Sequence, residues 1–262
     1  MIELLEHQLL AVALASLRLG VCWHVMPLLA RDTLPTLLRS GMVIAMSLIF
    51  APALLPLVQQ ASVPMLCIAA LGEGLIGLML GIAVSALFWA VQTAAALIEV
   101  QGGSQIATLF DPSSGGEDGP LSVGLRSAFV AYFVSLGGIA WLLGVVTVSF
   151  QVWTPGQPLF EALPSGAHGV VDWGLGLLDS SAAAGISLAA PVVVSMLAVE
   201  LGLGMVGRVA PQLQVFFAAM PLKALVSLGV LAIQMTSILA DLVDRIPAPA
   251  RFISGLQGAA GG

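Results

Sequence analysis

Six charged side chains interrupt the apolar stretches of the sequence, and their type and position could carry chemistry. They are Arg18, Glu73, Glu99, Glu200, Arg208 and Lys223. A charge inside a membrane is costly and is usually kept for a transport pathway or for a charged partner. One hypothesis is a proton or ion relay, as in a stand-alone secondary transporter that uses Glu99 or Glu200. The other is a set of ion pairs between helices or subunits, which the near balance of acids and bases favours.

Catalytic and metal-binding patterns form the next class of candidates. The sequence contains no HExxH pair, GxSxG elbow, phosphate-binding loop or paired Cys/His ligands. Its histidines, His7, His24 and His168, are widely separated, and Cys22 and Cys67 each lie in an apolar stretch. The sequence therefore predicts that the protein is not an enzyme and that it uses no metal and no cofactor.

An irregular segment runs from Gly102 to Pro120 between two apolar stretches. It contains five glycines, two prolines and four serines or threonines, so it cannot be a continuous helix. Irregular backbone at membrane depth is tolerated where it is buried in protein or lines a wet cavity. We therefore expect this loop to face a pore or another subunit, with Ile106, Leu109 and Phe110 as an apolar constriction. The alternative is a plain exposed loop.

The composition indicates what kind of structural elements carry these residues. Of 262 residues, 59% are hydrophobic and only 8% are Asp, Glu, Lys or Arg, whereas soluble domains are about 25% charged. The net charge of −6 offers no basic surface for nucleic acid. The composition excludes a soluble protein and predicts an all-α integral membrane protein with about six apolar helical segments, some broken by Pro or Gly, in one domain over residues 1–262.

Runs without charged residues, trimmed at prolines and glycines, give the boundaries of these segments. The predicted apolar segments are residues 8–30, 39–58, 63–98, 127–150, 180–207 and 212–241. Residues 99–126 form the loop that contains the irregular segment, and residues 151–179 have the Pro, Gly and Trp content of an interfacial loop. Gly77, Gly81 and Ser85 have a spacing that lets helix backbones approach closely, although glycine is common in membrane helices in any case.

Three stretches of the sequence are distinctive. They are GLIGLMLG at 74–81, ALIEVQGGSQIATLFDP at 96–112 and APVVVSMLAVELGLGMVGRVAPQLQVFFAAMPLKALV at 190–226. Together they resemble the SctT/FliR family, which is the T subunit of the type III secretion export gate in injectisomes and flagella. One departure is Gln214, where the family often has Asn, and Gln keeps the amide on a longer arm. The FDPSSG pattern at 110–115 favours the injectisome type over the flagellar type.

The resemblance implies a non-enzymatic structural and gating subunit of that export gate. Such a subunit helps to form the channel through which unfolded polypeptides cross the bacterial inner membrane. It also implies helical hairpins like those of an R and an S subunit fused together. The implied partners are the export-gate R and S subunits, the U (switch) subunit, the secreted polypeptides and the lipid membrane, but no nucleic acid. The location would be the inner membrane, within the basal body of the secretion system.

The resemblance also implies roles for individual residues. A plug at the pore constriction would be formed by Gly102, Gly103, Ile106, Leu109, Phe110, Asp111 and Pro112. The glycines would let this loop enter and leave the lumen, and the apolar tips would seal it. Helix packing or subunit contact is expected of Glu73, Glu99, Glu200, Arg208, Pro211, Gln212, Pro221 and Lys223.

Overall fold

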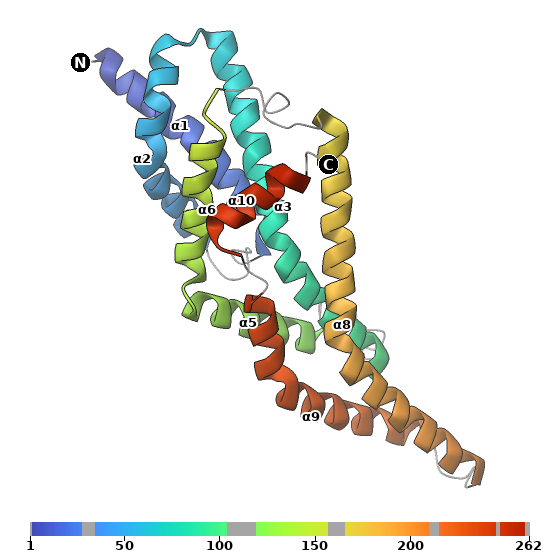
Figure 1. Ribbon diagram of the computed structural model, residues 1–262. Helices are drawn as coiled ribbons and strands as arrows, with labels where there is room; N and C mark the ends of the chain where they lie inside the picture. The colour runs from blue at the N-terminus through green and yellow to red at the C-terminus, as the bar shows by residue number, and fades with distance from the viewer. Residues whose placement is uncertain are drawn as a thin grey trace. The chain divides into compact units, whose positions relative to one another are not determined.

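Helices make up the regular structure of the chain (Figure 1). The computed structural model describes residues 2–27, 35–103, 119–156, 166–209, 215–244 and 247–259, and these ranges contain no strand. The helices are α1 (Ile2–Val25), α2 (Thr36–Gln60), α3 (Val63–Gly102), α5 (Pro120–Ser135), α6 (Gly138–Val152), α8 (Gly166–Val209), α9 (Val215–Asp244) and α10 (Pro249–Ala259). The prediction of an all-α protein is confirmed.

Within the described residues, five helices are long and apolar enough to cross a membrane. They are α1, α2, α3, α8 and α9. The number becomes six if α5 and α6, which are interrupted at Leu136 and Gly137, count as one broken span. The expectation of an integral membrane protein built from apolar helices, some of them broken, is confirmed.

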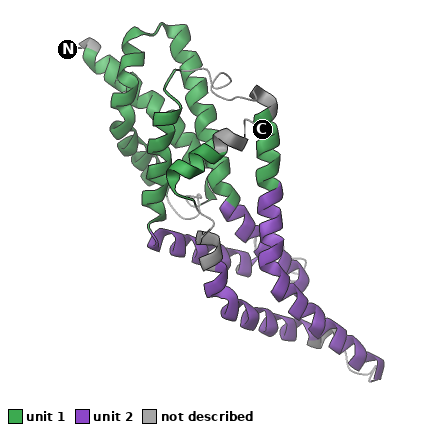
Figure 2. Cartoon of the chain, in the orientation of Figure 1, with its two compact units in different colours: residues 1–86, 137–178, 246–262 green, residues 87–136, 179–245 purple. Residues whose placement is uncertain are grey.

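The chain divides into two compact units, which Figure 2 shows in different colours. The first unit holds residues 1–86, 137–178 and 246–262, and the second holds residues 87–136 and 179–245. The long helices α3 and α8 each contribute one end to each unit. Each unit has a buried core of its own.

In the first unit, α1 turns a stripe of buried side chains toward its neighbours. Leu14, Ala15, Leu19 and Cys22 are all buried, and they recur at the spacing of three or four residues that places side chains on one face of a helix. Arg18 lies in the middle of this stripe and is 0% exposed. The face of α1 that packs is therefore apolar except for one cation.

The backbone of α1 also packs directly against small residues of α3. A Cβ atom at Gly77 would overlap the carbonyl of Arg18, and a Cβ at Gly81 would lie 3.0 Å from the carbonyl oxygen of Cys22. Ser85 Oγ donates a hydrogen bond of 3.2 Å to the carbonyl of Val25. The close helix approach predicted from the spacing of small residues is confirmed.

The carboxyl-terminal helix α10 packs on α6 in the same unit. Trp141 Nε1 donates a hydrogen bond of 2.8 Å to the carbonyl of Pro247, and the rings of Trp141 and Phe252 meet edge to face with centroids 5.2 Å apart. The sequence patterns do not predict α10. Its apolar residues are too few for a span, and a short surface helix of this kind lacks the long charge-free run on which the prediction relied.

In the second unit, α5 packs against the carboxyl-terminal part of α3 through contacts between aromatic rings. Phe88 lies edge to face with Phe129 and Phe133, with ring centroids 5.1 and 5.7 Å apart. On α8, a Cβ at Gly185 would lie 2.6 Å from the Cβ of Thr93 and 2.8 Å from the carbonyl oxygen of Ala90. These contacts bring α5 and α8 against the last turns of α3, where the irregular segment begins.

Several predicted boundaries differ from the observed ones. The segment 127–150 is two helices, because Gly137 adopts φ +83 and ends the helical geometry between α5 and α6. The interfacial loop expected over 151–179 is helical from Gly166 onward, because no proline separates that residue from the apolar residues that follow. The segment predicted over 39–58 is the longer helix α2 (Thr36–Gln60), which contains Pro52 and Pro56 as predicted.

Candidate functional site

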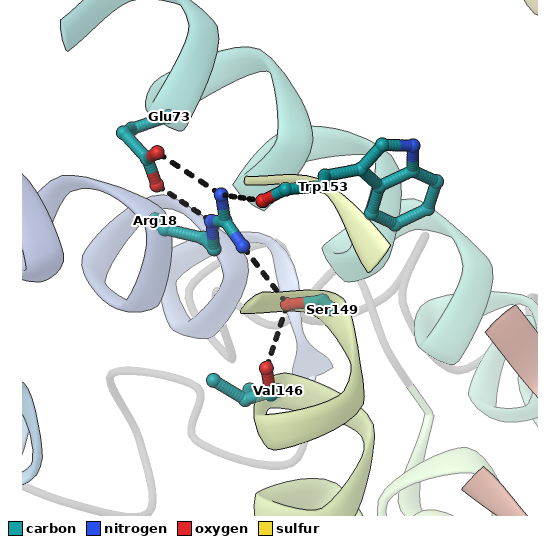
Figure 3. Close-up of polar contacts among 5 residues, drawn as sticks. All are labelled: Arg18, Glu73, Val146, Ser149 and Trp153. Carbon is teal, nitrogen blue, oxygen red and sulfur yellow. Dashed lines mark hydrogen bonds and ion pairs between the residues drawn. The ribbon is translucent and has the colours of Figure 1, made fainter. Parts of the chain in front are cut away.

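The first candidate site is a buried ionic network in the first unit (Figure 3). Arg18 Nε donates to Glu73 Oε2 at 2.6 Å and Arg18 Nη2 donates to Glu73 Oε1 at 3.0 Å, so the guanidinium binds both carboxylate oxygens. Arg18 Nη1 donates to Ser149 Oγ at 3.3 Å, and Nη2 also donates to the carbonyl of Trp153 at 3.2 Å. The guanidinium carbon lies 3.9 Å from the ring centroid of Phe150. One arginine thus links α1 to α3 and to the end of α6.

This network is enclosed. The exposed fractions of the Arg18 and Glu73 side chains are 0% and 1%. Taking both charges out of polar surroundings is unfavourable, and the two-pronged geometry together with the further acceptors offsets that cost. The predicted pairing of ionisable groups between helices is therefore present here. Four of the five N–H groups of the guanidinium have acceptors within the chain, as expected of a structural link.

The second candidate site lies in the second unit, at the end of α3. Lys223 Nζ on α9 contacts Glu200 Oε1 on α8 at 2.5 Å and donates to the carbonyl of Gln101 at 3.3 Å. Gln101 Nε2 donates to Glu200 Oε2 at 3.1 Å. The three helices meet through three side chains. The ammonium group of Lys223 lies against the carbonyl of Gln101 in the last turn of α3, where the helix dipole favours positive charge.

Glu99 binds the first turn of α5 in the same unit. Its Oε1 accepts hydrogen bonds of 2.9 Å from the backbone N–H groups of Leu121 and Ser122, and its Oε2 accepts one of 2.7 Å from Ser122 Oγ. The negative charge lies at the helix end that favours it. The carboxylate of α3 thus replaces the side-chain cap that Gly119 at the N-cap position of α5 lacks.

Two cavities border these residues. An apolar cavity of about 690 Å³ is lined by residues of α3, α5, α8 and α9, among them Ile98, Leu125, Met196 and Leu231, and Glu99 is part of the same lining. A more polar cavity of about 470 Å³ includes Gln101, Glu200 and Lys223 in its lining. The end of α3 therefore lies between an apolar and a polar space.

Several predicted site residues lie outside the part of the chain that the structure describes. They are Ile106, Leu109, Phe110, Asp111, Pro112, Pro211 and Gln212. Gly102 ends α3, and Gly103 follows it with φ +77. Arg208 and Pro221 are exposed, on the last turn of α8 and in the first half of α9. The roles of all these residues stay predictions.

Some residues of these sites were not anticipated. Ser149, Phe150 and the carbonyl of Trp153 complete the surroundings of Arg18, and Gln101 and Ser122 complete those at the end of α3. Their polarity within apolar runs is the feature of the sequence that could have indicated them, since a serine or glutamine in such a run needs a hydrogen-bond partner. Which group becomes the hydrogen-bond partner depends on tertiary contacts, and the sequence pattern does not specify these.

We expect Glu200→Leu to destabilise the protein more than Lys223→Met. Loss of Glu200 leaves a lysine side chain that is 11% exposed without its carboxylate, whereas loss of Lys223 leaves a glutamate side chain that is 47% exposed and still bonded to Gln101. An uncompensated charge costs more where it is more deeply buried, so the difference should be about 1–2 kcal/mol. Thermal unfolding of the purified complex measures it. Equal losses in the two variants would contradict this asymmetry.

Metal chemistry finds no support among the described residues, where no group of three or more His, Cys, Asp or Glu side chains could hold an ion. The charged groups of both sites are instead engaged with one another or with backbone groups. The arrangement is suited to holding helices and the two ends of a loop in place.

Comparison with known proteins adds the family. The sequence pattern of the family described as bacterial export proteins, family 1, matches residues 9–247. The chain is 29% identical over 229 residues to Yop proteins translocation protein T of Yersinia pestis, covering 86% of this chain and 85% of that protein. It is 30% identical over 244 residues to secretion system apparatus protein SsaT of Salmonella typhimurium, covering 89% and 90%. It is 28% identical over 253 residues to flagellar biosynthetic protein FliR of Caulobacter vibrioides, covering 91% and 93%. Because the match spans nearly the whole chain, the protein belongs to the bacterial export proteins, family 1, as its resemblance to the SctT/FliR family predicted.

Proposed function

We propose that this protein is a non-enzymatic structural and gating subunit of a type III secretion export gate, which helps to form the channel for unfolded proteins. The observation that carries the proposal is the family match over residues 9–247. Relatives of 29% and 30% identity are named as a translocation protein and a secretion system apparatus protein. The role is protein export within a membrane complex.

The injectisome type is the branch that we assign. Yop proteins translocation protein T and SsaT support it by their names, and the FDPSSG pattern at 110–115 supports it from the sequence. The FliR proteins are the flagellar relatives. The substrates in this proposal are unfolded secreted polypeptides.

The partners in this proposal are the R, S and U subunits of the export gate. Large apolar side chains exposed on α2 and α8 support a protein that is surrounded by lipid or other subunits. They include Leu37, Ile49, Leu201, Met205 and Val209. The proposed location is the bacterial inner membrane, within the basal body of the secretion system.

Gating is assigned to the loop between α3 and α5. In this proposal Ile106, Leu109 and Phe110 seal the lumen, Asp111 and Pro112 form a turn, and the preceding glycines let the backbone move. Support comes from the composition of the loop and from the polar contacts that hold both of its described ends. An apolar seal of this kind blocks ions and small molecules while it can yield to a passing polypeptide.

The double variant Leu109→Ala, Phe110→Ala is expected to make the assembled gate leak small molecules. Truncating both side chains removes the apolar bulk of the seal, whereas the loop keeps its length. Uptake of a small fluorescent or toxic solute by cells that carry the whole secretion system measures the leak. Ser113→Ala, Ser114→Ala is the matched control in the same loop, and it should leave the membrane tight.

Native mass spectrometry tests the assembly of the same variants. For this measurement the tagged chain is purified in mild detergent from its own host. The proposal expects one copy of the chain within a complex of several small membrane subunits, in the wild type and in both variants. A tight membrane in the Leu109 and Phe110 variant, with the complex intact, would count against the seal. Recovery as a stable monomer or homodimer would count against the export gate and favour a stand-alone transporter.

A further inference from the structure

The structure shows how the chain itself holds the two ends of the loop between α3 and α5. At the first end, Gly103 donates its N–H to the carbonyl of Val100 at 3.2 Å, and Lys223 Nζ contacts the carbonyl of Gln101 at 3.3 Å. At the second end, Gly119 precedes α5, and Glu99 contacts the residues that follow it. Glu99 is thus two residues from Gln101 and belongs to the same last turns of α3.

The contacts of Glu99 complete the hydrogen bonding of the first turn of α5. A helix begins with N–H groups that have no partner within the helix. In α5, Pro120 has no N–H, Leu121 and Ser122 donate to Glu99 Oε1, and Val123 donates to the carbonyl of Gly119 at 3.1 Å. One carboxylate from α3 therefore supplies the acceptors that a capping side chain at position 119 would ordinarily supply.

Gly119 makes this approach of the carboxylate possible. Its backbone has φ −71 and ψ 166, an extended conformation that any residue can adopt, so conformational freedom is not what the glycine provides. A Cβ atom at this position would instead overlap the carboxylate of Glu99. Because Gly119 has no side chain, the carboxylate of Glu99 can occupy the space where a Cβ atom would otherwise lie.

The surroundings make the contact hard to replace. Glu99 lines the apolar cavity together with Ile98, Leu125 and Met196. In such surroundings a charge-assisted hydrogen bond is stronger than in water, and an N–H group left without its acceptor is correspondingly costly. The carboxylate and the start of α5 therefore stabilise each other.

We propose that Glu99 is a positioning residue that fixes the start of α5, and with it the second end of the gating loop, to the last turns of α3, and that the proposed seal depends on this anchor. The inference rests on the proposed gating function and goes beyond it. It assigns Glu99 to a contact between helices of this chain, which is one of the two roles, helix packing or subunit contact, that the sequence predicted.

Hydrogen/deuterium exchange of the purified complex tests the anchor without reference to secretion. In Glu99→Ala, the amides of Leu121 and Ser122 lose their charged acceptor and should exchange at least about tenfold faster, while the part of α3 around Phe88 stays protected. Glu99→Gln, which keeps the shape of the side chain and one acceptor oxygen, should give a smaller increase. If the alanine variant fails to fold, Glu99→Gln still tests the anchor.

Gly119→Ala tests the same contact from the other side. The added methyl should displace the carboxylate and reproduce the fast exchange of Glu99→Ala. Gly124→Ala is the matched control, because it adds the same methyl to α5 at a place where no atom lies within 4 Å. Unchanged protection of Leu121 and Ser122 in both Glu99→Ala and Gly119→Ala would overturn the anchor.

Solute leak in cells then tests what the anchor does. Glu99→Ala and Gly119→Ala should leak, whereas Gly124→Ala should not. If the Leu109 and Phe110 variant leaks but the two anchor variants do not, the positioning role is overturned while the seal stands. If none of them leaks, the seal itself fails, and exchange at Leu121 and Ser122 alone decides whether Glu99 is an anchor.

Discussion

Arg18→Ala is expected to destabilise the first unit by about 3–5 kcal/mol, because it leaves the carboxylate of Glu73 buried without a counter-charge. The guanidinium also serves Ser149 Oγ and the carbonyl of Trp153, so both lose a donor. Thermal unfolding of the purified complex, followed by tryptophan fluorescence, and the amount of chain recovered in the complex both report the loss. The effect should be large because the pair is completely enclosed.

A double substitution separates the charge from its packing. Arg18→Met combined with Glu73→Met removes both charges and should recover a substantial part of the stability, giving a favourable coupling of about 2 kcal/mol or more. Glu6→Gln, which changes an exposed carboxylate on the same helix α1, is the control and should change little. Additive losses in Arg18→Met and Glu73→Met would contradict the buried pair.

The predictable part of the fold comes from composition. A bilayer-length helix requires about 20 apolar residues, so the charge-free runs of α2, α3, α8 and α9 could be located without knowledge of their neighbours. The same criterion does not locate α10 or the first turns of α8. Their residues do not form long charge-free runs, and α10 owes its place to local contacts such as that of Trp141 with Pro247.

The charged residues show a different limit. That Arg18 and Glu73 need partners follows from their apolar surroundings, and pairing between helices could be expected. That they pair with each other across 55 residues, and that Ser149, 131 residues from Arg18, joins them, depends on which helix faces meet. Single-sequence patterns describe one helix at a time and do not contain this information.

Glu99 shows the same limit at the gating loop. The sequence predicted helix packing or subunit contact for this intramembrane carboxylate, and the start of α5 provides hydrogen-bond donors for it within the chain. The signal in the sequence was the pair Gly119 and Pro120, which gives a helix start without a capping side chain and with one N–H fewer. A helix of that kind requires an acceptor from elsewhere, and only the fold shows that Glu99 supplies it.

Gly77→Ala is the second substitution for which we expect a large effect. The new Cβ would overlap the backbone carbonyl of Arg18, and backbone in a packed helix cannot move aside as the end of a flexible side chain can. Overpacking of this kind costs about 1–3 kcal/mol, more than the gain in helix propensity of about 1 kcal/mol on replacing glycine by alanine. The displaced segment of α1 carries Arg18, so the contact with Glu73 should weaken at the same time.

Gly74→Ala gives the matched comparison, because it lies one turn earlier in α3 and its Cβ would meet no atom within 4 Å. There only the gain in helix propensity applies, so this variant should be as stable as the wild type or slightly more stable. The unfolding temperatures of the two variants, measured in the same purified complex, should therefore move in opposite directions. Equal temperatures would mean that α1 and α3 are not in backbone contact at Gly77. The close approach that places Arg18 beside Glu73 would then have to be abandoned, together with the stability predicted for their pair.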